Sequence, residues 1–135
     1  KQHIQQNKKF LGICLGFQIL FESSEEHGNV EGLGILPGHF KKIKSNTLKV
    51  PHMGWNQIQI KNNASMYNNI DNQSHVYFVH SYAISKTDEN IIASTSNYET
   101  EFISAIQQNN LWATQFHPEK SGDIGLNLLT NFIKN

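Results

Sequence analysis

Residues 10–18 (FLGICLGFQ) decide the fold, because a short apolar run there meets a cysteine between two glycines. Residues 10–13 are apolar and few, which predicts a buried strand. Residues 15–26 predict a helix, since their leucine and isoleucine side chains recur on one helical face and acidic residues follow. The cysteine therefore lies where a predicted strand meets a predicted helix.

The position of Cys14 is typical of a nucleophile on a sharp strand-to-helix turn, with Cys in place of Ser. Such a turn brings backbone close to backbone, so it needs small residues two positions before and after, and Gly12 and Gly16 supply them. The turn would also place the thiol at a helix N-terminus, where the dipole favours thiolate. A lone cysteine on a strand can equally be a small buried hydrophobic residue. The stretch alone leaves both interpretations open.

A second motif, Phe116-His117-Pro118-Glu119, follows the last predicted strand. A histidine and a carboxylate at this spacing suit a relay, in which His117 takes the thiol proton and Glu119 fixes its tautomer. Pro118 sets a rigid bend between them. Sites in α/β domains gather at strand ends, which favours a functional interpretation of this motif.

The composition is that of an ordinary globular domain. The chain has 135 residues, 38% hydrophobic and 16% charged, which fits one domain with one core. Basic and acidic residues both number 11, so no basic excess favours nucleic acid, and no apolar stretch is long enough to span a bilayer. The single cysteine excludes an intramolecular disulfide, which fits a reducing, cytoplasmic compartment.

All 11 basic residues are lysines. A substrate carboxylate therefore cannot be held by a bidentate guanidinium, and backbone N–H groups, hydroxyls or a lysine must hold it instead.

The rest of the chain alternates like β-strands and ends in a helix. Strands are expected near residues 33–36, 55–60, 75–84, 91–95, 102–107 and 111–116, with a tight Asn-containing turn at 108–110. A closing amphipathic helix is predicted from Ile124, Leu128, Leu129, Phe132 and Ile133. Helices at both ends with strands between them predict an α/β domain with a mixed sheet.

Together, GICLGFQ at residues 12–18 and FHPE at residues 116–119 resemble the class I (triad) glutamine amidotransferases. Within that class, PHMGWN at residues 51–56, HSY at 80–82 and HPEKSG at 117–122 resemble the glutaminase subunit of imidazole glycerol phosphate synthase. The resemblance implies an α/β fold with a mixed, mostly parallel central sheet flanked by helices. It also implies a single amidotransferase domain over residues 1–135 that lacks the family's first strands and its Gly-rich oxyanion loop.

The resemblance implies that Cys14 is the nucleophile, His117 the base and Glu119 its orienting partner. It makes glutamine the substrate. The positions implied to bind it are Leu15, Gln18, Glu26, His80, Ser81 and Tyr82.

The chemistry of these residues agrees with those roles. Glu26 can attract the substrate ammonium, and Ser81 and Tyr82 can offer N–H and hydroxyl donors to its carboxylate. The N–H of Leu15 can be one oxyanion donor. Without the resemblance, Glu26 would be predicted to face solvent, and Tyr82, on a strand, would be predicted to pack against other side chains.

A partner surface is also implied, since several positions match the family's synthase-facing side: Met53, Trp55, Asn56, Tyr77 and Lys120. Trp and Tyr are enriched at interface cores, although Trp55 could instead be a core residue. The implied partner is a barrel-shaped synthase (cyclase) subunit in a heterodimer. No metal and no cofactor are expected, because the histidines have no metal-site spacing and one cysteine is available.

The leading hypothesis is a glutaminase subunit that hydrolyses glutamine to glutamate and ammonia through a cysteinyl thioester. The ammonia would pass to a synthase that makes imidazole glycerol phosphate in histidine biosynthesis. The alternatives are a paralogous glutaminase that feeds another acceptor, such as a surface-sugar amidation pathway, and a truncated, non-catalytic partner-binding module. Because the second oxyanion donor is expected in the segment before residue 1, residues 1–135 alone are expected to be a poor glutaminase.

Overall fold

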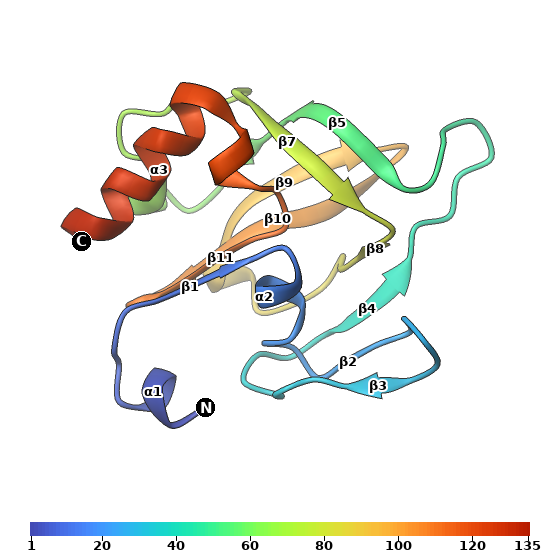
Figure 1. Cartoon of the computed structure of the whole chain (residues 1–135), viewed down its shortest axis with the longest axis horizontal. Coiled ribbons are helices and arrows are strands. Elements are labelled where there is room, and N and C mark those ends of the chain that lie inside the picture. The colour runs from blue at the N-terminus through green and yellow to red at the C-terminus, as the bar shows by residue number, and fades with distance from the viewer.

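The structure, a computed structural model, describes residues 1–135 as a central sheet, a second sheet and a two-stranded ribbon (Figure 1). The helices are α1 (Gln2–Gln5), α2 (Leu15–Gln18) and α3 (Gly122–Lys134), with 3-10 turns η1 (Ser65–Tyr67), η2 (Glu89–Ile91) and η3 (Pro118–Lys120). The strands are β1 (Phe10–Ile13), β2 (Ser23–Ser24), β3 (Val30–Glu31), β4 (His39–Lys42), β5 (His52–Gln57), β6 (Gln59–Ile60), β7 (His75–His80), β8 (Tyr82–Ala83), β9 (Ile92–Tyr98), β10 (Thr100–Gln108) and β11 (Leu111–Thr114). None of the helices combines the length and the apolar character needed to cross a membrane.

The central sheet has the strand order β1-β11-β10-β9-β6. The pair β1–β11 is parallel, and the other pairings are antiparallel. The mixed α/β fold is therefore confirmed, but the expectation of mostly parallel pairing is not met within residues 1–135. The reason is local: β9, β10 and β11 follow one another through tight turns, and strands joined in this way pair antiparallel. Asn109, at φ 52°, lies in one of these turns, as expected of an Asn-containing hairpin.

Both faces of the central sheet are buried, each against its own apolar cluster. Trp112 of β11 packs with Leu128 of α3 in one cluster. Its strand neighbours Leu111 and Ala113 pack with Phe17 of α2 in the other cluster. Successive strand residues point to opposite faces, so β11 contributes to both.

The closing helix is confirmed as α3, which lies beside β7 and η3 (Figure 1). Leu128 is buried, and Ile124 and Phe132 pack against the same cluster. Ile133, predicted on the same face, is exposed, because it lies about 100° around the helix from Phe132, which packs against the cluster.

The predicted helix over residues 15–26 is much shorter than expected. Only Leu15–Gln18 is helical, and Ser23–Ser24 forms a strand instead. A strand was expected near residues 33–36, yet the N–H groups of these residues bond back to the chain that leaves α2: Leu33 donates to Ile19 (2.7 Å) and Ile35 donates to Leu20 (2.9 Å). These carbonyls lie in the turns that leave a helix end, where they need partners. The glycine-rich segment thus caps a short helix and has no sheet partner of its own.

The predicted strand over residues 75–84 is broken at Ser81. Its first part, β7, pairs with β5 along the whole register from His52↔His80 to Gln57↔His75. Its second part, β8, leaves that ribbon and pairs with β4. The break carries the chain from the ribbon to the second sheet, so residues 80–82 lie where the two meet.

Candidate active site

Cys14 and His117 follow adjacent parallel strands, β1 and β11. The register pairs Ile13 with Thr114, and the N–H of Cys14 donates to the Thr114 carbonyl at 2.8 Å. The carboxyl ends of neighbouring parallel strands lie at the same edge of a sheet, which is where α/β sites form. The two motifs that are far apart in the chain therefore meet at one strand edge.

The turn at Cys14 is strained. Its backbone has φ 52° and ψ −104°, outside the regions that a residue with a side chain usually occupies. A Cβ added at Gly12 would lie 2.5 Å from the Gly16 carbonyl oxygen, so position 12, two residues before the cysteine, requires glycine. A Cβ at Gly16 would meet nothing within 4 Å, so the expected need for a small residue there is not met by contact.

On balance the surroundings of Cys14 disfavour the thiolate, contrary to the expectation from a helix N-terminus. Burial raises the pKa of Cys14, the Leu15 N–H lowers it, Glu119 and Glu26 raise it further, and Lys120 lowers it. The helix that follows has only four residues, so its dipole is small. The cysteine therefore depends on a base to remove its proton.

His117 is arranged as that base. Its Nδ1 lies 2.6 Å from a Glu119 carboxylate oxygen. A carboxylate accepts hydrogen bonds, so Nδ1 carries the ring proton and Nε2 keeps a free lone pair that can accept one. His117 Nε2 is buried and has no hydrogen-bond partner within the protein. An unpartnered, buried imidazole nitrogen is available to a reacting group.

The ribbon strand β7 holds the histidine loop in place. The N–H of His117 donates to the Tyr77 carbonyl at 2.9 Å. Ser121, which is buried, donates from its hydroxyl to the His117 carbonyl at 2.7 Å and accepts from the Tyr77 N–H at 2.9 Å. Farther along β7, the Val79 carbonyl accepts from the Cys14 thiol at 3.9 Å. One strand therefore touches both halves of the site.

Gln115 is a site residue that the sequence interpretation missed. It is fully buried, its Nε2 lies 3.8 Å from the Cys14 sulfur, and its Oε1 accepts from the Gln18 side chain at 3.1 Å. A polar residue directly before the FHPE motif, at the end of an otherwise apolar strand, was the available signal. A polar side chain that is buried at a strand end needs hydrogen-bond partners, so its position and orientation are fixed by those partners.

Three of the predicted glutamine-binding residues come together around one hollow. Leu15, Gln18 and Glu26 line a cavity of about 170 Å³ beside α2. Ser81 and Tyr82 are half-buried and do not line it. The predicted roles of the last two residues remain predictions.

His80 is buried in a hydrogen-bonded chain with His52 of β5. His80 Nδ1 faces the Tyr82 carbonyl at 2.9 Å, and a carbonyl can only accept, so this nitrogen carries the proton. His80 Nε2 then accepts from His52 Nδ1 at 2.8 Å, and His52 Nε2 accepts from the Asn56 amide at 3.3 Å. In this series of hydrogen bonds every donor faces an acceptor only when both imidazole rings are neutral.

Burial keeps both rings neutral. It is the main cause that lowers the pKa of His52 to about 4, with His80 as a further cause. Burial also lowers the pKa of His80 to about 4, although the bond to the Tyr82 carbonyl opposes it and His117 adds to it. His80 thus belongs to the internal framework behind residues 81–82.

Several of the residues that were predicted to face a partner lie on the outer face of the ribbon, and their role in binding a partner stays a prediction. Met53 and Trp55 of β5 are 63% and 57% exposed, which excludes the alternative that Trp55 is a core residue. Trp55 makes an edge-on contact with Tyr77, at 6.0 Å between ring centroids, and Lys120 is exposed next to Glu119. Asn56 does not join this face, because its amide bonds inward to His52 and to the Asn97 carbonyl.

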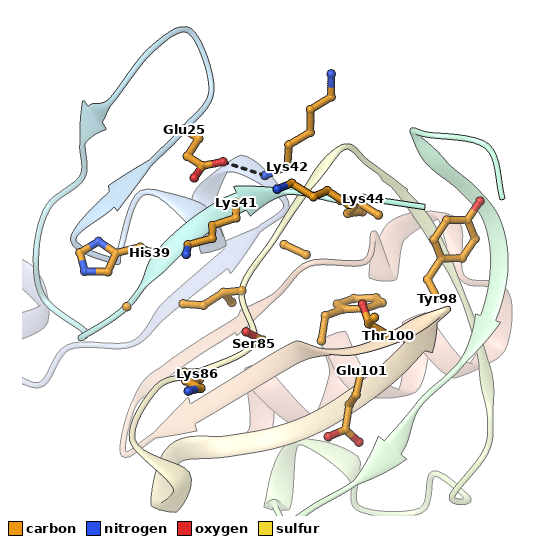
Figure 2. A pocket seen from close by; sticks show the side chains of 15 residues that line it. Glu25, His39, Lys41, Lys42, Lys44, Ser85, Lys86, Tyr98, Thr100 and Glu101 are labelled. Atoms are coloured by element: carbon orange, nitrogen blue, oxygen red, sulfur yellow. Dashed lines mark hydrogen bonds between the residues drawn. The ribbon is translucent and has the colours of Figure 1, made fainter. Parts of the chain in front are cut away.

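A larger hollow, of about 570 Å³, lies away from the catalytic residues between β4 and the β9–β10 hairpin (Figure 2). Its rim carries Lys41, Lys42, Lys44 and Lys86. In Figure 2 the side chain of Lys42 points away from Lys41 and Lys86. The lysines do not converge on one point, and no triad residue reaches this hollow. The predicted catalytic residues therefore lie at the strand edge described above and away from this hollow.

Comparison with known proteins agrees with this geometry. The chain matches the family described as "Glutamine amidotransferase class-I" over residues 1–135. It is 45% identical over 137 residues to the imidazole glycerol phosphate synthase subunit HisH of Syntrophotalea carbinolica, covering 97% of this chain and 66% of that protein. It is 47% identical over 135 residues to the chloroplastic imidazole glycerol phosphate synthase hisHF of Arabidopsis thaliana, covering 98% of this chain and 23% of that protein.

The fold is also found in solved structures. A glutamine amidotransferase from Thermotoga maritima superposes with a TM-score of 0.67 at 16% identity, covering 98% of this chain and 50% of that one. The chain thus spans about two thirds of the length of the bacterial HisH and about a quarter of the plant protein. Since the family match extends over residues 1–135, and Cys14 and the His117–Glu119 pair follow adjacent parallel strands, this chain belongs to the class I glutamine amidotransferases.

Proposed function

We propose that this chain is the glutaminase part of an imidazole glycerol phosphate synthase. It hydrolyses glutamine to glutamate and ammonia through a thioester on Cys14, and the ammonia passes to a synthase partner in histidine biosynthesis. The observation that carries the proposal is the pairing of a strained Cys14 turn with a His117–Glu119 relay across β1 and β11. Similarity to HisH over nearly the whole chain supports the choice of acceptor pathway.

The reaction follows from the protonation states at the site. His117 Nε2 removes the thiol proton, and the sulfur attacks the side-chain carbonyl carbon of glutamine to form a tetrahedral intermediate. Its C–N bond breaks as the imidazolium returns the proton to nitrogen, so ammonia leaves and a thioester remains. Water, deprotonated by His117, then attacks the thioester carbonyl, and the thiol leaves with glutamate as product.

The raised pKa of the thiol fits this sequence. A cysteine that stays protonated until His117 accepts its proton is protected from unproductive oxidation and alkylation. Glu119 stabilises the imidazolium that forms, and the 2.6 Å bond is short, as charge-assisted hydrogen bonds are. Cys14 and His117 therefore become a charged pair only when the reaction starts.

Substrate binding is assigned to residues around the α2 hollow. Glu26 is placed to attract the ammonium group of glutamine, and Gln18 lies between that hollow and the nucleophile. The N–H of Leu15 is proposed as an oxyanion donor, because it follows the nucleophile directly. Ser81 and Tyr82 are proposed to hold the substrate carboxylate, as an Arg-free chain requires.

The partner is proposed to be a barrel-shaped synthase subunit bound as a heterodimer in the cytoplasm. The support is an exposed aromatic and apolar face on the ribbon, formed by Met53, Trp55 and Tyr77. Exposed Trp and Met side chains are uncommon on surfaces that stay in water, and they are typical of interface centres. One strand of this ribbon, β7, contacts both His117 and Cys14, so the partner would dock directly behind the catalytic site.

The test uses the full-length protein with its synthase partner and follows glutamate and imidazole glycerol phosphate separately. Cys14→Ser should abolish turnover that depends on glutamine and leave turnover with added ammonium salt unchanged. Tyr67→Phe, which removes a buried hydroxyl bonded to Ser94 far from the triad, is the matched control and should retain both activities. Glutamine-dependent product from the Cys14→Ser protein would refute the assignment of the nucleophile.

A further inference from the structure

The Gln115 side chain occupies a position between two predicted site residues. It follows β11 directly, and none of its surface is exposed. Its oxygen accepts from Gln18 Nε2 at 3.1 Å, so its nitrogen points the other way, toward the Cys14 sulfur at 3.8 Å. Sulfur is large, and this separation is within hydrogen-bonding range for an N–H group and a sulfur atom.

The thiolate that the reaction needs faces several unfavourable neighbours. Glu26 and Glu119 are the acidic groups that act on it, and the Val79 carbonyl, which accepts from the thiol, would repel the anion. The favourable groups are the Leu15 N–H and Lys120, together with His117 once it is protonated. Lys120 is exposed, so water weakens its effect.

We propose that Gln115 is a catalytic residue that donates an N–H to the Cys14 sulfur and stabilises its thiolate. Gln18 is the positioning residue that acts through it. The contribution to turnover rests on the proposed glutaminase function, but the effect on the thiol does not.

A glutamine suits this place for physical reasons. An amide gives a buried anion a donor without adding a second buried charge, which a lysine would do at large desolvation cost. The amide has two ends, and only one favours the thiolate. Gln18 selects that end, because its N–H must face the oxygen of Gln115. If the amide were reversed, its oxygen would face the sulfur and repel the anion.

The experiment measures the rate of Cys14 alkylation by iodoacetamide against pH in the full-length protein, with the modified peptide quantified by mass spectrometry. The variants are Gln115→Met, which fills the space without a donor, and Gln18→Met, which removes the anchor. The control is Gln107→Met, because Gln107 also bonds at both ends, to Met66 and Ser65, but lies away from the site. Circular dichroism confirms that each variant is folded.

The Gln115→Met protein should show an alkylation midpoint about one pH unit higher, which is a roughly tenfold smaller thiolate fraction below the midpoint. Gln18→Met should shift the midpoint in the same direction by less, and Gln107→Met should leave it unchanged. The midpoint is used, because a higher thiol pKa also makes each thiolate more nucleophilic and partly hides the change in rate.

An unchanged midpoint in Gln115→Met, or an equal shift in Gln107→Met, overturns the proposal. If Gln115→Met does not fold, an unchanged midpoint in Gln18→Met overturns it instead. The readout needs neither glutamine nor a partner. A shifted midpoint in a protein that never hydrolyses glutamine would sink the proposed function and leave the role of Gln115 at the thiol intact.

Discussion

Acidification should destabilise the folded protein through the buried pair His52 and His80. In the folded state the pKa of each is about 4, below its ordinary value of 6.5. Between these values the unfolded chain binds more protons than the folded one, so the free energy of unfolding rises with pH. Stability from the pair is therefore complete above about pH 6.5 and is lost as the pH falls toward about 4.

The magnitude follows from the two pKa values. At pH 5, one histidine with these values lowers the free energy of unfolding by about 2 kcal/mol relative to neutral pH. Two independent histidines would lower it by about 4 kcal/mol. His52 Nδ1 and His80 Nε2 lie 2.8 Å apart, where two imidazolium rings would repel each other, so their titrations are coupled, and we expect a total between about 2 and about 4 kcal/mol. A domain stable by about 5–15 kcal/mol would show this clearly.

The assay is urea unfolding of the full-length protein at pH 7.5 and pH 5. The double variant His52→Phe with His80→Leu removes both titrating groups and should lose about 2–4 kcal/mol less between the two pH values than the unmodified protein. His75→Gln, at an exposed position on the same strand as His80, should keep the original pH dependence. Equal losses in the unmodified protein and the double variant would refute the reasoning.

Three further predictions concern the site and the proposed interface. Glu119→Gln should lower kcat for glutamine by at least about a hundredfold with little change in KM, because His117 loses the partner that sets its tautomer. A smaller effect in steady-state kinetics would contradict the proposed relay. Gly12→Ala should reduce both stability and activity, since the added Cβ would lie 2.5 Å from the Gly16 carbonyl oxygen, whereas Gly16→Ala should be far milder; thermal unfolding of the pair checks the order. Trp55→Ala should weaken binding to the synthase by about 2 kcal/mol, roughly thirtyfold, without lowering the melting temperature, and unchanged affinity in calorimetry would remove Trp55 from the interface.

Much of the secondary structure could be predicted from local patterns, and its errors have identifiable causes. β1, β10, β11 and α3 follow periodicities that their own residues set. The helix after Cys14 was predicted too long, because apolar side chains at helical spacing also occur in a compact loop. There the buried Leu20 and Phe21 are packed by tertiary contacts, and their carbonyls accept from residues 34–36. Periodicity alone cannot tell those two cases apart.

In the candidate site, too, some residues could be predicted from local patterns and others could not. Cys14, His117 and Glu119 were predicted from short motifs, because the turn requires glycine two residues before Cys14 and the Glu119 carboxylate lies only two residues after His117. Gln115 was not found, although it directly precedes the second motif. The proposed role of Gln115 depends on its contact with the sulfur of Cys14, which lies 101 positions earlier in the chain.

The sequence by itself determined the chemical groups of the proposed site: a single cysteine on a glycine-flanked turn, a histidine–glutamate pair, and no arginine that could hold a carboxylate. These are properties of residue type and of spacing within a few positions, so a linear pattern carries them. The tertiary structure alone decided that β1 pairs with β11 in parallel, that Gln115 turns its N–H toward the thiol, and that burial keeps the hydrogen-bonded His52 and His80 neutral. Each of these depends on contacts between distant segments and on exclusion of water, which exist only after both faces of the sheet are covered.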